Sequence, residues 1–306
     1  MKIEDILKEA FGNSFEILKK VQAGLRCKTF IVKKNNTKFI FQLYTENTIY
    51  QAQKKYKVLK TLNIREIPKA YKYFECNEYS YLITEYKEGI NLSELHNDEK
   101  IDFVYKDLAK VLVNIHNIKY NKFGWITDKC VIENNSFIDY IKEEYNRLKV
   151  NLELIDYDIR IRIQEKVKKV IEEINIESQE IKESVLCWYD INPDNILVKE
   201  DKLTAVLDPG GARYGVPEWD LSFIKMEVCR NKEEFDKFLN YYRMYSNYDV
   251  NLKLLNALTV IVELDDMAVR ILDKINLPIP YDSNFKEEIK LLEMWKYLWF
   301  YQRYFS

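Results

Sequence analysis

Histidine is scarce in this chain of 306 residues, with only His96 and His116 present. Zinc enzymes and hydrolases built on a histidine base need such side chains as ligands or proton acceptors. Both classes are therefore disfavoured. His116 lies in the apolar run LAKVLVNIHNI, which predicts a helix carrying a structural histidine. The five cysteines are scattered without the paired spacing of a zinc or redox site, so we expect free thiols.

Long apolar runs are also missing. None reaches the roughly 18 residues that a membrane helix requires. The first residues, MKIEDILKEAFG, form an amphipathic pattern with charges of both signs and not a signal peptide. We therefore expect a soluble, cytoplasmic protein without a membrane partner. A net charge of −2 and a pI near 6.0 argue against nucleic acid as the main partner.

The small net charge conceals an uneven distribution. Residues 1–86 contain 16 lysines and arginines and 9 acidic residues, whereas the remainder contains 31 and 40. A basic first part and an acidic second part would suit a polyphosphate nucleotide and a cationic acceptor, respectively. Solvated faces that differ by chance explain the asymmetry equally well. The length of the chain and its 47% hydrophobic residues allow two lobes with a sizeable core.

The residues best suited to chemistry gather between positions 184 and 221. Three short apolar segments predict strands, and a polar loop, Asp190–Asp194, separates the first two. A turn over residues 199–202 separates the second strand from the third. The predicted strands are Val185–Cys187, Ile196–Val198 and Leu203–Leu207.

The turn predicts which residues of the hairpin face each other. If it closes between Asp201 and Lys202, residues whose numbers sum to 403 are paired, so Asn195 lies opposite Asp208. Cross-strand neighbours are about 5 Å apart. An amide oxygen and a carboxylate would then converge beside the loop that presents Asp190. Such oxygen ligands suit Mg²⁺ bridging phosphates.

The spacing Asp-x-x-x-x-Asn, followed by a hairpin and Asp-x-Gly, resembles the catalytic loop and metal-binding segment of the protein-kinase-like superfamily. DINPDNILV…LDPGGARYGVPEWDL is most similar to the aminoglycoside phosphotransferase and choline kinase branch. The resemblance implies that Asp190 is the catalytic base, that Asn195 and Asp208 bind Mg²⁺, and that Asp220 supports the catalytic loop. Asp220 also precedes the apolar run LSFIKMEV and is therefore a candidate helix N-cap, a role compatible with the first.

The same resemblance implies an α+β, bilobal fold. The N-lobe, residues 1–86, would be a small antiparallel sheet that binds nucleotide, and the C-lobe, residues 87–306, would be mainly helical. In the N-lobe we expect strands at Phe15–Gln22, Cys27–Val32 and Lys38–Tyr44. The loop between the first two would cover the nucleotide through Gly24, although a plain hairpin turn remains the alternative.

The chain departs from this family pattern at four positions. Gln42 occupies the place of the usual phosphate-binding lysine, and Lys55, on a helix predicted over Thr48–Leu62, the place of its acidic partner. We interpret the two as a joint change in which Lys55, or a lysine or arginine of residues 26–28, supplies the missing cation; a surface lysine is the alternative. Trp188 and Asn192 stand where relatives carry histidine.

The segment after the predicted hairpin of Ala70–Cys76 and Tyr79–Thr84 resembles the superfamily hinge, in which backbone groups of residues such as Glu85 and Lys87 bind the nucleotide base. In the second lobe, Arg213 could neutralise phosphate, but we interpret it as a solvent-facing loop residue. Helices are predicted over 101–118, 137–151, 156–174, 232–245, 252–274 and 285–301.

The helix predicted over residues 252–274 is apolar nearly all round, yet it contains Glu263, Asp265 and Asp266. Carboxylates in such a helix need cations, donors or a water-filled cleft. Because relatives hold ammonium groups with acidic residues from this region, the resemblance makes these three candidates for binding the acceptor. Structural salt bridges explain them equally well.

The sequence thus predicts a small-molecule kinase that transfers the γ-phosphate of ATP or GTP, with Mg²⁺, to a hydroxyl of a small, cationic acceptor such as an aminoglycoside or amino alcohol. A catalytically weak nucleotide-binding module is one alternative. A metabolic sugar or amino-acid kinase is another, and a protein kinase is a third.

Overall fold

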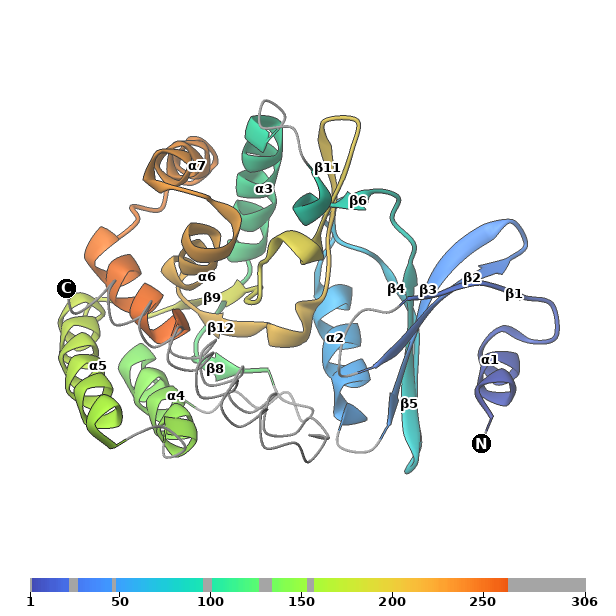
Figure 1. Cartoon of the computed structure of the whole chain (residues 1–306), viewed down its shortest axis with the longest axis horizontal. Coiled ribbons are helices and arrows are strands. Elements are labelled where there is room, and N and C mark those ends of the chain that lie inside the picture. Colours follow the sequence, from blue (N-terminus) through green and yellow to red (C-terminus); the bar gives the residue numbers. More distant parts are fainter. Residues whose placement is uncertain are drawn as a thin grey trace, which may run out of the picture.

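The computed structural model describes residues 2–21, 27–45, 48–95, 101–126, 134–152 and 157–263. A twisted antiparallel sheet forms one end of the molecule and a mainly helical part forms the other, with helix α2 (Tyr50–Thr61) between them (Figure 1). The predicted α+β class is confirmed. Within the described ranges, no helix is both long enough and apolar enough to cross a membrane.

The first lobe is built on a five-stranded antiparallel sheet. A two-residue turn at Asn35-Asn36 joins β2 (Lys28–Lys34) to β3 (Thr37–Thr45), and both asparagines have positive φ, as this hairpin type requires. One face packs helix α1 (Ile3–Phe11) through an aromatic cluster that includes Phe11, Phe41 and Tyr81. The strands run in the order β1 (Glu16–Val21), β2 (Lys28–Lys34), β3 (Thr37–Thr45), β5 (Tyr79–Glu85) and β4 (Ala70–Glu75).

Helix α2 packs against β3, β4 and β5 and also contacts the turn Pro209–Gly211. Its buried side chains include Ala52, Val58 and Leu59, as expected for a packed helix. They also include two lysines, Lys54 and Lys55. Buried lysines are rare unless they are paired, so α2 directs two cations toward the second lobe.

Short strands carry the chain from one lobe to the other. After β5, strand β6 (Ile90–Asn91) pairs with β10 (Ile196–Lys199), which also pairs with β11 (Lys202–Val206). At Gly89, φ is +154°, and an added Cβ would lie 2.8 Å from the Thr204 hydroxyl oxygen. Glycine is therefore required where this connection crosses the hairpin.

Helix α3 (Ile101–His116) is the centre of the second lobe. It packs against α7 (Lys232–Tyr245), β9 (Ser184–Cys187) and β11, with Leu108, Leu112 and Ile115 fully buried. The predicted apolar stripe is confirmed. The lobe also contains α4 (Phe137–Leu152), α5 (Tyr157–Glu177), α6 (Pro217–Phe223), a π-helical turn at Ile224–Val228 and a helix over 252–263.

A second small sheet precedes the loop that follows β9. Its strands run in the order β7 (Lys119–Tyr120), β9, β12 (Arg213–Gly215) and β8 (Gly124–Trp125). The chain therefore leaves β9 from a framework paired on both sides.

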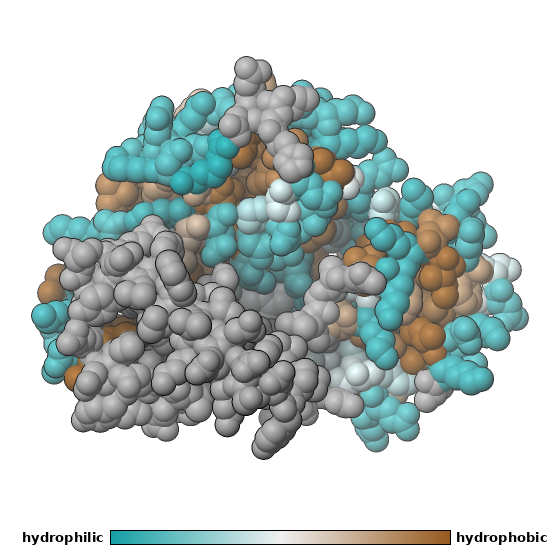
Figure 2. Space-filling model, viewed as in Figure 1, coloured by the Kyte–Doolittle hydropathy of each residue, from teal (hydrophilic) through white to brown (hydrophobic). Residues whose placement is uncertain are grey.

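Hydrophilic residues cover much of the described surface of this lobe in the view of Figure 2, with hydrophobic residues showing between them.

The register predicted for the β10–β11 hairpin is wrong. Lys199 pairs with Lys202, and Glu200-Asp201 form a two-residue turn with positive φ at both positions. A bulge between Leu197 and Val198 then shifts the pairing by one residue. As a result, the Asn195 carbonyl accepts a hydrogen bond from the amide of Leu207 at 2.7 Å, and Asn195 does not lie directly opposite Asp208.

Candidate phosphotransfer site

The loop after β9 presents Asp190 to solvent. Tyr189 and Asp190 both have left-handed backbone conformations, with φ of 58° and 51°. Such conformations are uncommon for residues other than glycine and persist only where the surroundings hold them.

Asp220 provides part of that support. One of its carboxylate oxygens accepts the amide of Trp188 at 2.7 Å, and the other accepts the amide of Tyr189 at 2.8 Å. The predicted N-cap role is wrong, because α6 begins at Pro217 and Asp220 lies inside it. Proline is preorganised for the first helical position and lacks the amide hydrogen that would otherwise be unsatisfied there. The helix therefore starts four residues before the apolar run.

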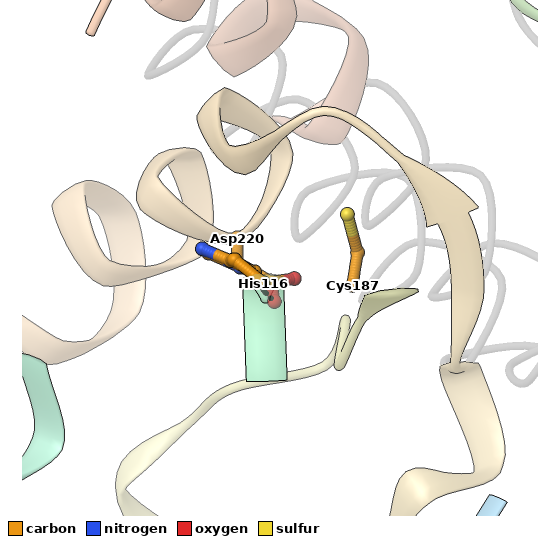
Figure 3. A group of neighbouring side chains, drawn as sticks. All are labelled: His116, Cys187 and Asp220. Carbon is orange, nitrogen blue, oxygen red and sulfur yellow. Dashed lines mark hydrogen bonds and ion pairs between the residues drawn. The ribbon is translucent and has the colours of Figure 1, made fainter. Parts of the chain in front are cut away.

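Behind this loop, His116 and Cys187 lie next to Asp220, all three buried and with ligand atoms within 4.8 Å of one another (Figure 3). The histidine Nε2 is 3.1 Å from Asp220, and its Nδ1 is 2.8 Å from the hydroxyl of Tyr242. The Cys187 thiol donates to the carbonyl of Val216, and burial raises its pKa well above the usual value. Because the ring nitrogens and the carboxylate are engaged, we assign the cluster a structural role, and His116 is structural as predicted.

Trp188 ties the loop to the segment that follows the hairpin. Its side chain is fully buried, and its indole N–H donates to the carbonyl of Leu207 at 2.9 Å. Leu207 immediately precedes Asp208. Trp188 thus makes a polar contact that joins the two halves of the candidate site.

Asn192 organises the loop from within. Its side-chain oxygen accepts the amides of Asp194 and Asn195 at 3.0 and 3.1 Å, and its NH₂ donates to the Asp190 carboxylate at 2.9 Å. We did not single out Asn192 as a site residue from the sequence. An asparagine immediately before proline is a turn and cap signal that could have identified it.

Asn195 and Asp208 remain near each other despite the changed register. The Asn195 NH₂ donates to the backbone carbonyl of Asp190 at 3.1 Å, which leaves its side-chain oxygen as the atom that can coordinate a cation. Asp208, in a left-handed conformation, accepts the amide of Gly210 at 2.9 Å, and its side chain is 41% exposed. An amide oxygen and an accessible carboxylate beside Asp190 are a donor set that fits Mg²⁺.

Lys55 also reaches this point. Its Nζ lies 2.7 Å from Asp208 Oδ1, and only 7% of its side chain is exposed, so the interpretation as a surface lysine is wrong. Burial alone would lower the pKa of Lys55, but Tyr44 and Asp208 raise it overall. Gln42 accepts a hydrogen bond from the Tyr44 hydroxyl at 3.2 Å. The strand therefore contributes polar groups here, and the helix contributes the charge.

The interpretation of Arg213 as a solvent-facing loop residue is also wrong. Its guanidinium is fully buried between the rings of Trp125 and Tyr189, 3.5 and 3.3 Å from their centroids. It donates to the Tyr140 hydroxyl at 2.7 Å and pairs with Glu144 at 3.5 Å. Stacked cations of this kind hold aromatic rings in place, so Arg213 fixes Tyr189, the residue before Asp190.

The remaining predicted positions are only partly described. The amide of Glu85 donates to the carbonyl of Lys69 at 2.8 Å, so that N–H is engaged within the lobe, and the Glu85 carboxylate pairs with Lys87 at 3.0 Å. Glu263 is buried at 4% exposure. Gly24, Asp265 and Asp266 lie outside the described residues.

Comparisons with known proteins show the family and the fold of the chain. The model of the phosphotransferase enzyme family matches residues 17–249. A search of curated proteins found no match. Among solved structures, an aminoglycoside phosphotransferase, APH(4)-Ia, in complex with AMP-PNP and hygromycin B has a TM-score of 0.69 at 16% identity, covering 97% of this chain and 96% of that one.

Two other proteins of similar structure have names that indicate different acceptors. A putative fructosamine-3-kinase from Haemophilus somnus has a TM-score of 0.61 at 14% identity, with 91% of this chain and 92% of that chain covered. The macrolide 2'-phosphotransferase MphH from Brachybacterium faecium has a TM-score of 0.61 at 16% identity, with 88% and 91% covered. These likenesses show a shared kinase-like fold. Because the family model spans most of the chain, this protein belongs to the phosphotransferase enzyme family.

Proposed function

We propose that the chain transfers the γ-phosphoryl group of ATP or GTP to a hydroxyl of a small, cationic acceptor. The observation that carries this proposal is the convergence of Asp190, Asn195 and Asp208, linked through the Asn195 side chain and the indole of Trp188. Family membership and the kinase-like fold support the same reaction class.

Asp190 is the proposed proton acceptor. It accepts the proton of the attacking hydroxyl as the acceptor oxygen bonds to the γ-phosphorus and the bond to the leaving nucleoside diphosphate breaks. General-base assistance contributes about 10²- to 10⁴-fold in such reactions. The contact from Asn192 and the support from Asp220 keep the carboxylate oriented, so little reorganisation is needed when the acceptor arrives.

Asn195 and Asp208 are the proposed Mg²⁺ ligands. When bound, the ion would neutralise charge on the phosphate oxygens. Neighbouring groups orient the two ligands. Asp208 is held by the amide of Gly210 and the ammonium of Lys55, and the Asn195 side chain is held by the carbonyl of Asp190. Glu85 and Lys87 are the proposed hinge positions for the base, and Gly24 belongs to the proposed loop over the phosphates.

The acceptor is proposed to be cationic because the second lobe is acidic. Residues 87–306 carry 31 basic and 40 acidic side chains, and this excess attracts cations. Glu263, Asp265 and Asp266 are the proposed ammonium-binding residues. This part of the proposal is separate from the identity of the phosphoryl donor.

A panel of aminoglycosides, macrolides, amino alcohols and sugars tests the proposal. Each compound is incubated with the protein, MgCl₂ and either ATP or GTP, and nucleoside diphosphate release is followed. We expect acceptor-dependent release with at least one cationic compound, and none when EDTA replaces MgCl₂. Nucleotide-induced thermal stabilisation without release for any acceptor would favour a binding module instead.

A further inference from the structure

Among the described residues around Asp208, the positive charge comes from helix α2, and strand β3 contributes uncharged polar groups. Lys55 on α2 lies 2.7 Å from Asp208, whereas β3 presents Gln42 and Tyr44 at this place. The Lys55 ammonium is 5.4 Å from the centroid of the Tyr44 ring. The chain of contacts therefore runs from Gln42 through Tyr44 and Lys55 to Asp208.

Two other buried cations, Lys54 and Arg213, contact aromatic rings instead of Asp208. The Lys54 ammonium lies over the ring of Trp125 at 4.8 Å, and Arg213 is enclosed between Trp125 and Tyr189. Both are buried. Neither is placed to neutralise the charge of Asp208 in the way that Lys55 is.

Gly210 makes room for this contact. A Cβ added at position 210 would lie 3.1 Å from Lys55 Cε and 2.9 Å from Asp208 Oδ1. An added Cβ would therefore require the Asp208 carboxylate and the Lys55 side chain to shift, so glycine at this turn favours their close contact.

We propose that Lys55 is the positioning cation of the nucleotide-phosphate site and that it acts from helix α2 through Asp208. This inference rests on the proposed function. Without Lys55, the carboxylates of Asp190 and Asp208 would both face an incoming polyphosphate. Like charges at close range repel strongly where water is partly excluded. The lysine offsets one carboxylate and fixes its orientation, so the phosphates and their metal meet a site of lower negative charge.

Binding of Mg²⁺·AMP-PNP, measured by calorimetry, tests the proposal in the full-length protein. Lys55→Met keeps a linear apolar side chain and removes the charge. Since Asp208 is 41% exposed, water can solvate it in this variant, and the fold should survive. We expect AMP-PNP affinity to fall by about tenfold or more, as loss of a close charge contact implies. Lys60→Met, an exposed position on the same helix, is the matched control and should bind as the wild type does.

Adenosine binding separates a phosphate role from a merely structural one. If Lys55 only held helix α2 in place, Lys55→Met would weaken adenosine and AMP-PNP by the same factor. We expect adenosine affinity to change by less than about twofold, because adenosine lacks the groups that the charge serves.

The binding test discriminates most strongly when the positive charge is moved from Lys55 on α2 to position 42 on β3. Lys55→Glu places a second carboxylate beside Asp208 and should weaken AMP-PNP more than Lys55→Met does. Adding Gln42→Lys should recover most of that loss by returning a cation to the site from β3, whereas adding Gln42→Met should not.

The outcomes distinguish the role of Lys55 from the proposed phosphotransferase function. Wild-type affinity for AMP-PNP in Lys55→Met would overturn the role of Lys55 and leave the proposed function standing. Equal losses for adenosine and AMP-PNP would also overturn it. A wild-type protein that binds neither ATP nor GTP analogues with Mg²⁺ would overturn the proposed function, and this inference with it.

Discussion

Replacing Arg213 by methionine should severely destabilise the protein. The guanidinium is fully buried and pairs with Glu144, whose side chain is only 3% exposed. Removing one partner of a buried pair costs about 3 to 5 kcal/mol, because the other charge is left without compensation. The two ring contacts, at 3.5 and 3.3 Å from the centroids, add about 1 kcal/mol or more. We therefore expect a loss of about 4 to 6 kcal/mol.

Urea unfolding followed by tryptophan fluorescence measures this loss, because Trp125, Trp188 and Trp219 are all in described parts of the second lobe. The matched double variant, Arg213→Met with Glu144→Gln, removes the stranded charge while leaving an oxygen that can accept the indole hydrogen of Trp125, as Glu144 does. It should recover about 2 kcal/mol or more of the loss.

Two results would refute this reasoning. Arg213→Met could unfold within about 1 kcal/mol of the wild type, which would mean that the stacked guanidinium contributes little. Alternatively, the double variant could be no more stable than Arg213→Met, which would place the cost in the lost stacking and not in the stranded carboxylate of Glu144.

Of three further predictions, two concern residues of the loop, and the third concerns Glu218, a buried carboxyl on α6 that contacts Tyr248 and Asn251. Trp188→Phe removes the hydrogen bond to Leu207 and should cost about 1 to 2 kcal/mol in urea unfolding; wild-type stability would contradict this. Asn192→Ala removes the contact to Asp190 and should lower kcat more than KM, whereas unchanged kcat would show that the carboxylate needs no such support. Burial raises the pKa of Glu218 to about 7, so in the folded state it retains its proton above the pH at which the unfolded chain releases it. Its contribution to stability is therefore present below about pH 4.5 and lost as pH rises to about 7. The stability of the wild type relative to Glu218→Gln should fall by about 2 to 3 kcal/mol between about pH 5 and pH 8. A difference that stays constant with pH would contradict the raised pKa of Glu218.

The sequence predicted the elements well because each carries a local signal. Alternating apolar residues and asparagine turns identify β2 and β3, and the period of the apolar residues identifies α3. The loop that presents Asp190 was also predictable, since its spacing is set by the short chain between β9 and β10.

Side-chain environments were harder to predict because they depend on contacts distant in the sequence. Arg213 follows three residues of glycine and alanine and reads as a loop arginine, yet Trp125, Tyr140 and Glu144 enclose it from another part of the chain. The hairpin register failed for a different reason. The turn closes between Glu200 and Asp201 and not between Asp201 and Lys202, so the numbers of paired residues sum to 401 next to the turn, and a bulge at Leu197 brings the sum to 402 instead of the predicted 403. Neither the exact position of the turn nor the bulge leaves a clear trace in the sequence.

The catalytic role of Asp190 is tested most directly by Asp190→Asn, compared with Asp194→Asn in the same loop. Both changes replace a carboxylate by an amide of the same shape, and both residues are exposed. With an acceptor found active in the panel, kcat for Asp190→Asn should fall by about 10²- to 10⁴-fold, while Mg²⁺·AMP-PNP affinity stays within about threefold of the wild type. Asp194→Asn should keep near wild-type kcat. Full turnover by Asp190→Asn would contradict the proposed mechanism.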